Sequence, residues 1–125
     1  MKEIVLVGIG GAVGAICRFL LSRTIQSIFG VPFPYGTLVV NVLGSFFVTF
    51  LSEVLIDRFV DWNIELRAFF LIGLLGAFTT FSSFSYEVVD FWKNGWGIGL
   101  IVYFLLSIIL CIGGAVGGLF IGRKL

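Results

Sequence analysis

The residues best suited to act on a small ion lie between Gly76 and Ser85. This stretch reads Gly-Ala-Phe-Thr-Thr-Phe-Ser-Ser-Phe-Ser, and five of the seven residues from Thr79 to Ser85 carry a hydroxyl. It falls inside an apolar segment long enough to cross a bilayer, where polar groups are costly unless they line a cavity or a path. The pattern therefore indicates passage of a small polar species. It contains no acid, base or nucleophile pair, so we predict that the chain is not an enzyme.

Two interpretations of this stretch remain open. If the helix breaks here, as the glycine and the Thr-Thr pair favour, the freed backbone carbonyls need a small cation, side chains or water as partners. If the helix is intact, the hydroxyls bond back to their own carbonyls. Phe81 and Phe84 are three residues apart and share a helix face. Their positively polarised ring edges can attract an anion, or the rings can simply pack.

Further polar residues within the apolar segments are Thr37, Asn41 and Arg18. Asn41 and Arg18 each have two interpretations. Asn41, which follows Thr37, can donate its amide hydrogens to an anion or bond to another helix, because an unbonded amide in lipid is costly. Arg18 can extend to the membrane surface or raise the anion concentration in a wet vestibule.

A polar stripe is expected on the last apolar segment, where Tyr103, Ser107 and Cys111 recur every four residues. It can pass an ion along or serve as a seam of hydrogen bonds between helices. Glu87 lies about two turns from the middle of its segment and can face a vestibule. Cys17 and Cys111 lie in apolar stretches, so we interpret both as packing residues.

The elements that must position these residues are membrane-spanning helices. Only 12% of the residues are charged, against about 25% in soluble domains, and the mean hydropathy is +1.16. Four apolar segments, each near the ~20 residues that span a bilayer, cover about residues 4–29, 37–56, 68–92 and 97–121. We predict turns at 30–36 and 93–95, an interfacial loop at 57–67 that includes Trp62, and one all-α transmembrane domain over residues 1–125.

Small residues recur at four-residue spacing in the first and last segments, which lets helix backbones approach closely in lipid. The pairs are Gly10 with Gly14, Gly11 with Ala15, Gly113 with Gly117, Gly114 with Gly118, and Gly118 with Gly122. Because four helices enclose little interior, these faces suggest that a partner chain completes the bundle. The bias of Lys and Arg between the two sides is only two or three charges, which permits insertion in both orientations and an antiparallel homodimer.

Several other functions have weak support. A net charge of +1 gives no sign of a nucleic-acid partner, and the chain has no histidine. A dinucleotide site is rejected, because Val13 replaces the third glycine of the fingerprint and no acid occurs between Glu3 and Glu53. The apolar run after Glu3 is too long for a signal peptide and is expected to be a retained helix. The alternative function, a small dual-topology proton-coupled multidrug exporter, needs a carboxylate at mid-membrane, where the sequence places none. A membrane scaffold without transport would leave the hydroxyl cluster unexplained.

Three stretches of the chain resemble the Fluc family of fluoride channels, also called CrcB. They are Gly10–Ala15 with Arg18, Pro34–Leu38 with Asn41 and Gly44–Phe46, and Gly76–Phe84. The resemblance implies a dual-topology antiparallel homodimer with two pores and a break in the third helix, located in the bacterial inner membrane. It also implies a passive channel that exports fluoride down its electrochemical gradient and so relieves fluoride toxicity.

The resemblance further implies roles for individual residues. The backbone carbonyls of Gly76 and Thr79 would hold a structural Na⁺ at the centre of the dimer interface, and Arg18 would line the aqueous vestibule. The predicted fluoride pore consists of Thr37, Asn41, Phe81, Ser82, Ser83, Phe84, Tyr103 and Ser107. Two departures are visible: Ser83 stands where threonine is frequent in the family, and Cys111 continues the stripe where a hydroxyl would be expected.

Overall fold

The computed structural model describes residues 1–58 and 63–125, and in these residues all regular structure is helical. The helices are α1 (Lys2–Phe29), α2 (Tyr35–Arg58), α3 (Asn63–Leu66), the π-helix η1 (Arg67–Leu75), α4 (Gly76–Phe78), α5 (Phe81–Lys93) and α6 (Gly97–Lys124). Together, α3, η1, α4 and α5 form one span that is interrupted after Phe78. Four helices in the described ranges are long and apolar enough to cross a membrane, which confirms the four predicted spans.

Two predicted connections differ from the structure. The loop expected over residues 57–67 is wrong at both ends, because α2 continues to Arg58 and α3 begins at Asn63. Charged residues end the apolar pattern without ending the helix: Glu65 lies in the first turn of α3, where the helix dipole favours an acid. The turn expected over 30–36 is shorter, because α2 begins at Tyr35 directly after Pro34. Trp62 lies outside the described residues.

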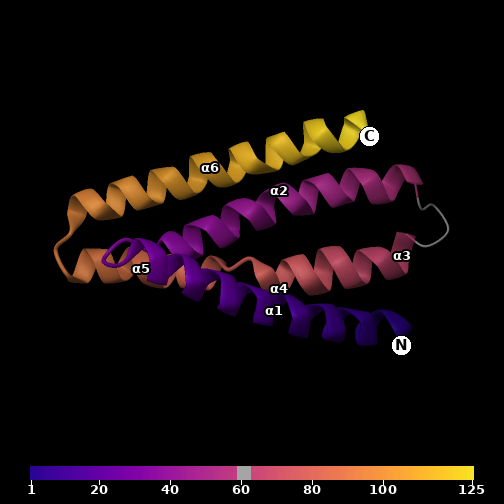
Figure 1. Cartoon of the computed structure of the whole chain (residues 1–125), viewed down its shortest axis with the longest axis horizontal. Coiled ribbons are helices and arrows are strands. Elements are labelled where there is room, and N and C mark those ends of the chain that lie inside the picture. The colour runs from indigo at the N-terminus through magenta and orange to yellow at the C-terminus, as the bar shows by residue number, and fades with distance from the viewer. Residues whose placement is uncertain (59–62) are drawn as a thin grey trace.

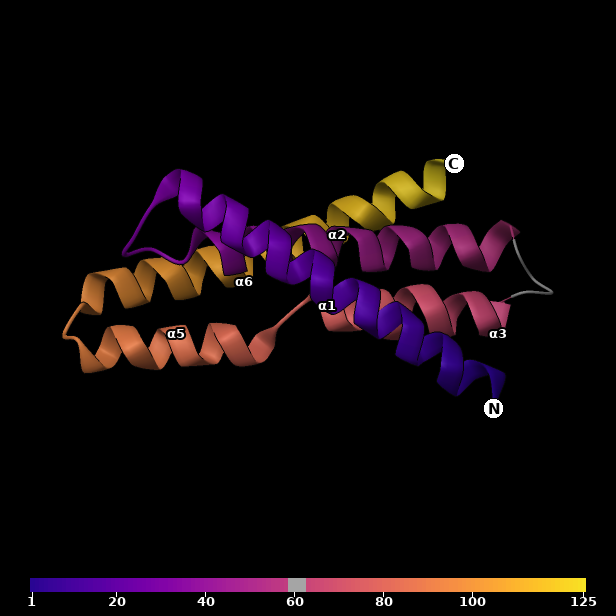
Figure 2. The same cartoon turned by 60° about the horizontal axis from the view of Figure 1, so that its bottom comes forward.

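The four spans lie side by side, with both termini at the same end, as an even number of spans requires (Figures 1 and 2). In both views α2 and α6 run next to each other in the same direction. The interruption between α4 and α5 lies near the middle of the third span, where the ribbon thins to an extended connection (Figure 1). The break is therefore at mid-membrane depth.

Glycines set the distances between these helices. A Cβ at Gly10 or Gly14 of α1 would collide with the backbone of η1, at Phe69 and Leu74 respectively. A Cβ at Gly118 of α6 would collide with the Phe46 carbonyl of α2. Most of the small-residue pairs that the sequence suggested for a partner chain thus pack inside the chain, against η1 and α2, whereas Gly113 is exposed and a Cβ there would meet nothing within 4 Å.

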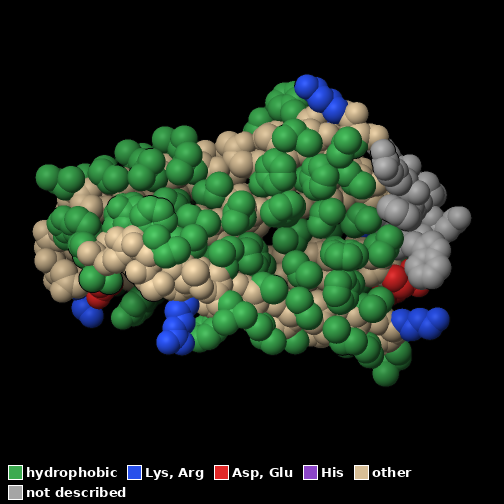
Figure 3. Space-filling model, in the orientation of Figure 1, with side chains coloured by type: hydrophobic (Ala, Val, Ile, Leu, Met, Phe, Trp, Pro, Cys, Tyr) green, Lys and Arg blue, Asp and Glu red, His purple; other side chains and the backbone are tan. Residues whose placement is uncertain are grey.

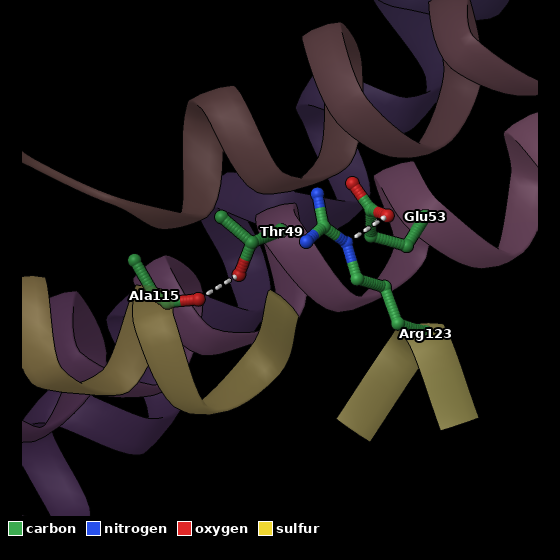
Figure 4. Close-up of polar contacts among 4 residues, drawn as sticks. All are labelled: Thr49, Glu53, Ala115 and Arg123. Atoms are coloured by element: carbon green, nitrogen blue, oxygen red, sulfur yellow. Dashed lines mark hydrogen bonds and ion pairs between the residues drawn. The ribbon is translucent and has the colours of Figure 1, made fainter. Parts of the chain in front are cut away.

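Polar contacts add to the pairing of α2 with α6 (Figure 4). The Thr49 hydroxyl donates to the Ala115 carbonyl across the interface at 2.7 Å. One helical turn further along α2, Glu53 pairs with Arg123, with 3.2 Å between Nε and Oε2. The hydroxyl bond is the stronger constraint of the two, since exposed ion pairs contribute little.

The outer surface is suited to lipid. Hydrophobic side chains cover most of the face in Figure 3, and few charged side chains interrupt them. Apolar residues along α6 are exposed, including Ile101 at 58% and Ile109 at 63%. With water on all sides such a surface would aggregate, so it supports a bilayer as the solvent.

We expect Gly14→Ala to destabilise the fold by about 1–3 kcal/mol, because its added methyl must displace the backbone of η1 at Leu74. Gly8→Ala in the same helix is the matched control, since its Cβ meets nothing within 4 Å. Thermal unfolding in detergent measures both variants. Equal midpoints for the two would contradict this account of the helix spacing.

Candidate functional site

The interruption in the third span consists of two extended residues. Thr79 has φ −77° and ψ 155°, and Thr80 has φ −149° and ψ 105°. The helix resumes at Phe81, where the Thr80 hydroxyl caps it by accepting the Ser83 N–H at 3.2 Å. Of the two interpretations of this stretch, the broken helix is therefore the correct one. The hydroxyls of Thr79 and Ser85 nevertheless bond back to helix carbonyls.

Asn41 of α2 pairs with the backbone at this break. Its Nδ2 donates to the Thr80 carbonyl at 3.0 Å, and the Thr80 N–H donates to its Oδ1 at 2.7 Å. In an unbroken helix that N–H would donate to the Gly76 carbonyl instead. Of the two interpretations of Asn41, the hydrogen bond to another helix is therefore present. The second hydrogen of its amide is still available as a donor.

A cavity of about 350 Å³ lies against the break. It brings together predicted residues from three spans: Asn41, Gly76, Thr79, Phe81, Phe84 and Ser107. The hydroxyl of Ser107 is buried and has no hydrogen-bond partner among the described residues. Buried hydroxyls are normally paired, and this one lies in a site that also holds the Asn41 amide.

A second cavity, of about 250 Å³, lies on the other side of Thr80. Its lining includes the predicted residues Arg18, Thr37 and Ser83, together with Ser22. Thr80 lines both cavities and is only 6% exposed. The break therefore lies between two cavities: the second is lined by the cationic side chain of Arg18, and the first by neutral donors and aromatic rings.

The two phenylalanines have different surroundings. Phe84 is 6% exposed and packs against Tyr103 at a centroid distance of 5.4 Å. Phe81 is 77% exposed in the single chain, and its ring centroid is 5.7 Å from that of Phe84. Both rings line the first cavity, with an angle of 46° between their planes. Their role as ring-edge donors to an anion remains a prediction.

Glu87 is a site residue whose importance the sequence concealed. The Thr37 hydroxyl donates to its Oε1 and the Tyr103 hydroxyl to its Oε2, each at 2.6 Å. One carboxylate thereby joins α2, α5 and α6. Tyr103 is fully buried and bonded to Glu87, so at this residue the predicted stripe serves as a seam of hydrogen bonds between helices. Within the stripe, Ser107 and Cys111 line the first cavity.

Ser82, like Phe81, is a predicted pore residue that the single chain leaves open. Its side chain is exposed, and its Oγ lies 3.3 Å from the Thr80 hydroxyl. Thr80 also donates to the Ser83 Oγ at 3.0 Å. The hydroxyls of residues 80, 82 and 83 thus form a connected group at the first turn of α5. Thr80 at its centre was missing from the predicted pore, and the signal for it was its place in the Thr-Thr pair.

These features define a class of protein: a multi-pass membrane protein with a donor-rich cavity at a broken transmembrane helix. The family model described as "CrcB-like protein, Camphor Resistance (CrcB)" matches residues 5–119, and the chain belongs to this family. This confirms the resemblance found in the sequence.

Curated relatives are similar over the whole chain. A protein of Agrobacterium fabrum is 41% identical over all of this chain and 99% of its own length. One of Aquifex aeolicus is 39% identical over the full length of both chains, and one of Ruminiclostridium cellulolyticum is 38% identical over all of this chain and 95% of its own. Each is named "Fluoride-specific ion channel FluC". With four membrane-capable helices, these bacterial relatives place the chain in the inner membrane as a multi-pass protein.

We expect Tyr103→Phe to destabilise the protein by about 1–3 kcal/mol, because it removes a buried donor and leaves one Glu87 oxygen without its partner. Tyr35→Phe is the control, since Tyr35 lies on the same bundle but is 37% exposed. Thermal unfolding in detergent again gives the measurement. A Tyr103→Phe protein as stable as the Tyr35→Phe protein would show that the bond from Tyr103 to Glu87 contributes nothing.

Proposed function

We propose that this chain is a fluoride-selective passive ion channel that exports fluoride down its electrochemical gradient and so relieves fluoride toxicity. The observation that carries the proposal is the first cavity, where the Asn41 amide, the Ser107 hydroxyl and two phenylalanine rings line one space. Full-length relatives named as fluoride-specific channels support the same substrate.

The chemistry of this cavity suits a small, strongly hydrated anion. Fluoride gives up its water only if several donors replace it, and amide, hydroxyl and ring-edge donors can do so together. None of these groups is a fixed cation that would trap the ion, and conduction requires binding weak enough for release. Arg18 lies in the neighbouring cavity, where its charge can concentrate anions before they reach the break.

The membrane potential is sufficient to drive export without a coupling reaction. At ~100 mV, moving one charge across the membrane is worth about 2.3 kcal/mol, or roughly fifty-fold in concentration. The proton-coupled exporter remains the weaker candidate. It needs a carboxylate at mid-membrane, whereas Glu87 is engaged by the Thr37 and Tyr103 hydroxyls. A passive channel of this kind catalyses no chemical reaction.

The proposal includes a second copy of the chain in antiparallel orientation. Exposed residues occur in the third span before, at and after the break: Ile72 at 64%, Phe81 at 77% and Tyr86 at 72%, with Gly76 also exposed. A partner against this span would bury the part of Phe81 that the single chain leaves open. Each pore would then be completed where the two copies meet.

A structural Na⁺ fits the same interface. The Gly76 carbonyl loses its helical donor because the Thr80 N–H turns to Asn41, and Thr79 is extended beyond the end of α4. Backbone carbonyl oxygens are hard donors of the kind that alkali and alkaline-earth cations prefer. The Gly76 and Thr79 carbonyls of both copies would hold the ion, which would supply a fixed positive charge between the two pores.

The proposed function is tested by anion efflux from vesicles that contain the purified protein. With a valinomycin shunt to balance charge, a fluoride electrode should record rapid efflux, and a chloride electrode should record only the rate of protein-free vesicles. Equal efflux of both anions, or of neither, would overturn the proposal. Proton flux recorded in the same vesicles distinguishes the exporter.

We expect Phe81→Ile to reduce fluoride efflux by about tenfold or more while the assembly stays folded, because it removes one polarised ring edge. Phe120→Ile on α6 is the control, since this ring is also exposed, at 60%, and lies far from the break. Normal fluoride efflux in the Phe81→Ile protein would exclude the ring from the pore.

Sodium removal is expected to weaken the dimer, because the Gly76 and Thr79 carbonyls of two copies would be left without their shared cation. Dimer dissociation is followed by subunit exchange in detergent, with Na⁺ replaced by N-methyl-D-glucamine at constant ionic strength. A dimer equally stable in both buffers would argue against the cation.

A further inference from the structure

One face of α2 contacts the two extended residues of the break. Asn41 and Gly44 are three residues apart, so they lie on the same side of this helix. Asn41 bonds to both backbone groups of Thr80. Gly44 is buried, and a Cβ there would collide with the Thr79 Cγ2 atom and come within 3.2 Å of the Phe78 ring.

The two bonds at Asn41 constrain the backbone itself. A primary amide that accepts from the N–H and donates to the C=O of one residue pairs with it as a neighbouring β-strand would. Such pairing requires an extended residue, and Thr80 has the matching φ of −149° and ψ of 105°. It also competes directly with the helical bond from the Thr80 N–H to the Gly76 carbonyl.

The contact at Gly44 constrains the residue before it. The Thr79 Oγ1 donates to the Leu75 carbonyl at 3.1 Å, which fixes the χ1 rotamer of this β-branched side chain. With Oγ1 held on Leu75, Cγ2 must lie against α2, and only glycine at position 44 leaves space for it. The position of Thr79, and with it the direction of its carbonyl, is therefore set by α2.

We infer that Asn41 and Gly44 are positioning residues that act through Thr80 and Thr79 to aim the Gly76 and Thr79 carbonyls at a common cation. This inference rests on the sodium site of the proposed function and assigns to α2 the task of building it. It gives Asn41 a role on the backbone, separate from any contact of its second amide hydrogen with an anion.

The test measures sodium binding rather than flux, because Asn41 also lines the proposed pore. Thermal unfolding of the dimer in detergent is recorded across a series of Na⁺ concentrations, with N-methyl-D-glucamine keeping the ionic strength constant. The midpoint of the sodium-dependent stabilisation reports the affinity of the site. Gly44→Ala should raise that midpoint by about tenfold, whereas the matched control Gly8→Ala, whose Cβ meets nothing, should leave it unchanged.

A second substitution separates positioning from general damage to α2. Thr79→Ser keeps the hydroxyl that bonds to Leu75 and removes Cγ2, the atom that a Cβ at position 44 would meet. The double variant Gly44→Ala/Thr79→Ser should therefore return the sodium midpoint to within about twofold of the wild type. Asn41→Leu should raise the midpoint as Gly44→Ala does, and Thr79→Ser should not rescue it.

The inference is overturned if Gly44→Ala has the wild-type midpoint, or if Thr79→Ser rescues neither or both of the α2 variants. It is also overturned if the wild type shows no sodium-dependent stabilisation, an outcome that leaves the channel standing when fluoride efflux is intact. Conversely, the expected sodium midpoints in a protein that does not conduct fluoride would support the positioning role of Asn41 and Gly44 and contradict the proposed function.

Discussion

The two hydrogen bonds between the Asn41 amide and the Thr80 backbone are the interaction on which the site depends. They satisfy an N–H and a C=O that would otherwise be stranded at mid-membrane, where each unpaired group is costly. They also separate the third span into two helices, and the cavity that collects Phe81, Phe84 and Ser107 exists because of that separation. A helix unbroken at Thr80 would carry the same residues without the space between them.

Such a break can persist only in a rigid frame, and glycine provides it. Close approach of α1 to η1 at Gly14, and of α6 to α2 at Gly118, fixes the helices that hold both sides of the interruption. On the far side, Glu87 ties α5 back to α2 and α6 through the Thr37 and Tyr103 hydroxyls. The polar residues of this chain therefore divide into two groups: some hold helices together, and others, such as Ser107, line the first cavity.

The spans and the position of the break could be predicted from the sequence, because lipid imposes long apolar runs and tolerates Thr79 and Thr80 only at a special site. Partners could not be predicted in the same way. Asn41 bonds to the backbone of a residue 39 positions away, and backbone groups carry no signature in the sequence. The ends of the helices near residues 57–67 were missed because charges stop an apolar pattern before they stop a helix. The small-residue faces were recognised from their spacing, but spacing alone does not say which helix fills them: Gly10, Gly14 and Gly118 pack against η1 and α2 of the same chain.

The central claim is that Thr79 and Thr80 are extended within the membrane while the residues on both sides are helical. Solid-state NMR of ¹³C,¹⁵N-labelled protein in lipid bilayers measures this directly through the Cα and Cβ chemical shifts of these two threonines. The account predicts strand-like shifts at Thr79 and Thr80, and helical shifts at Ala77 and from Ser82 onward. Helical shifts at every residue from Gly76 to Ser85 would contradict it.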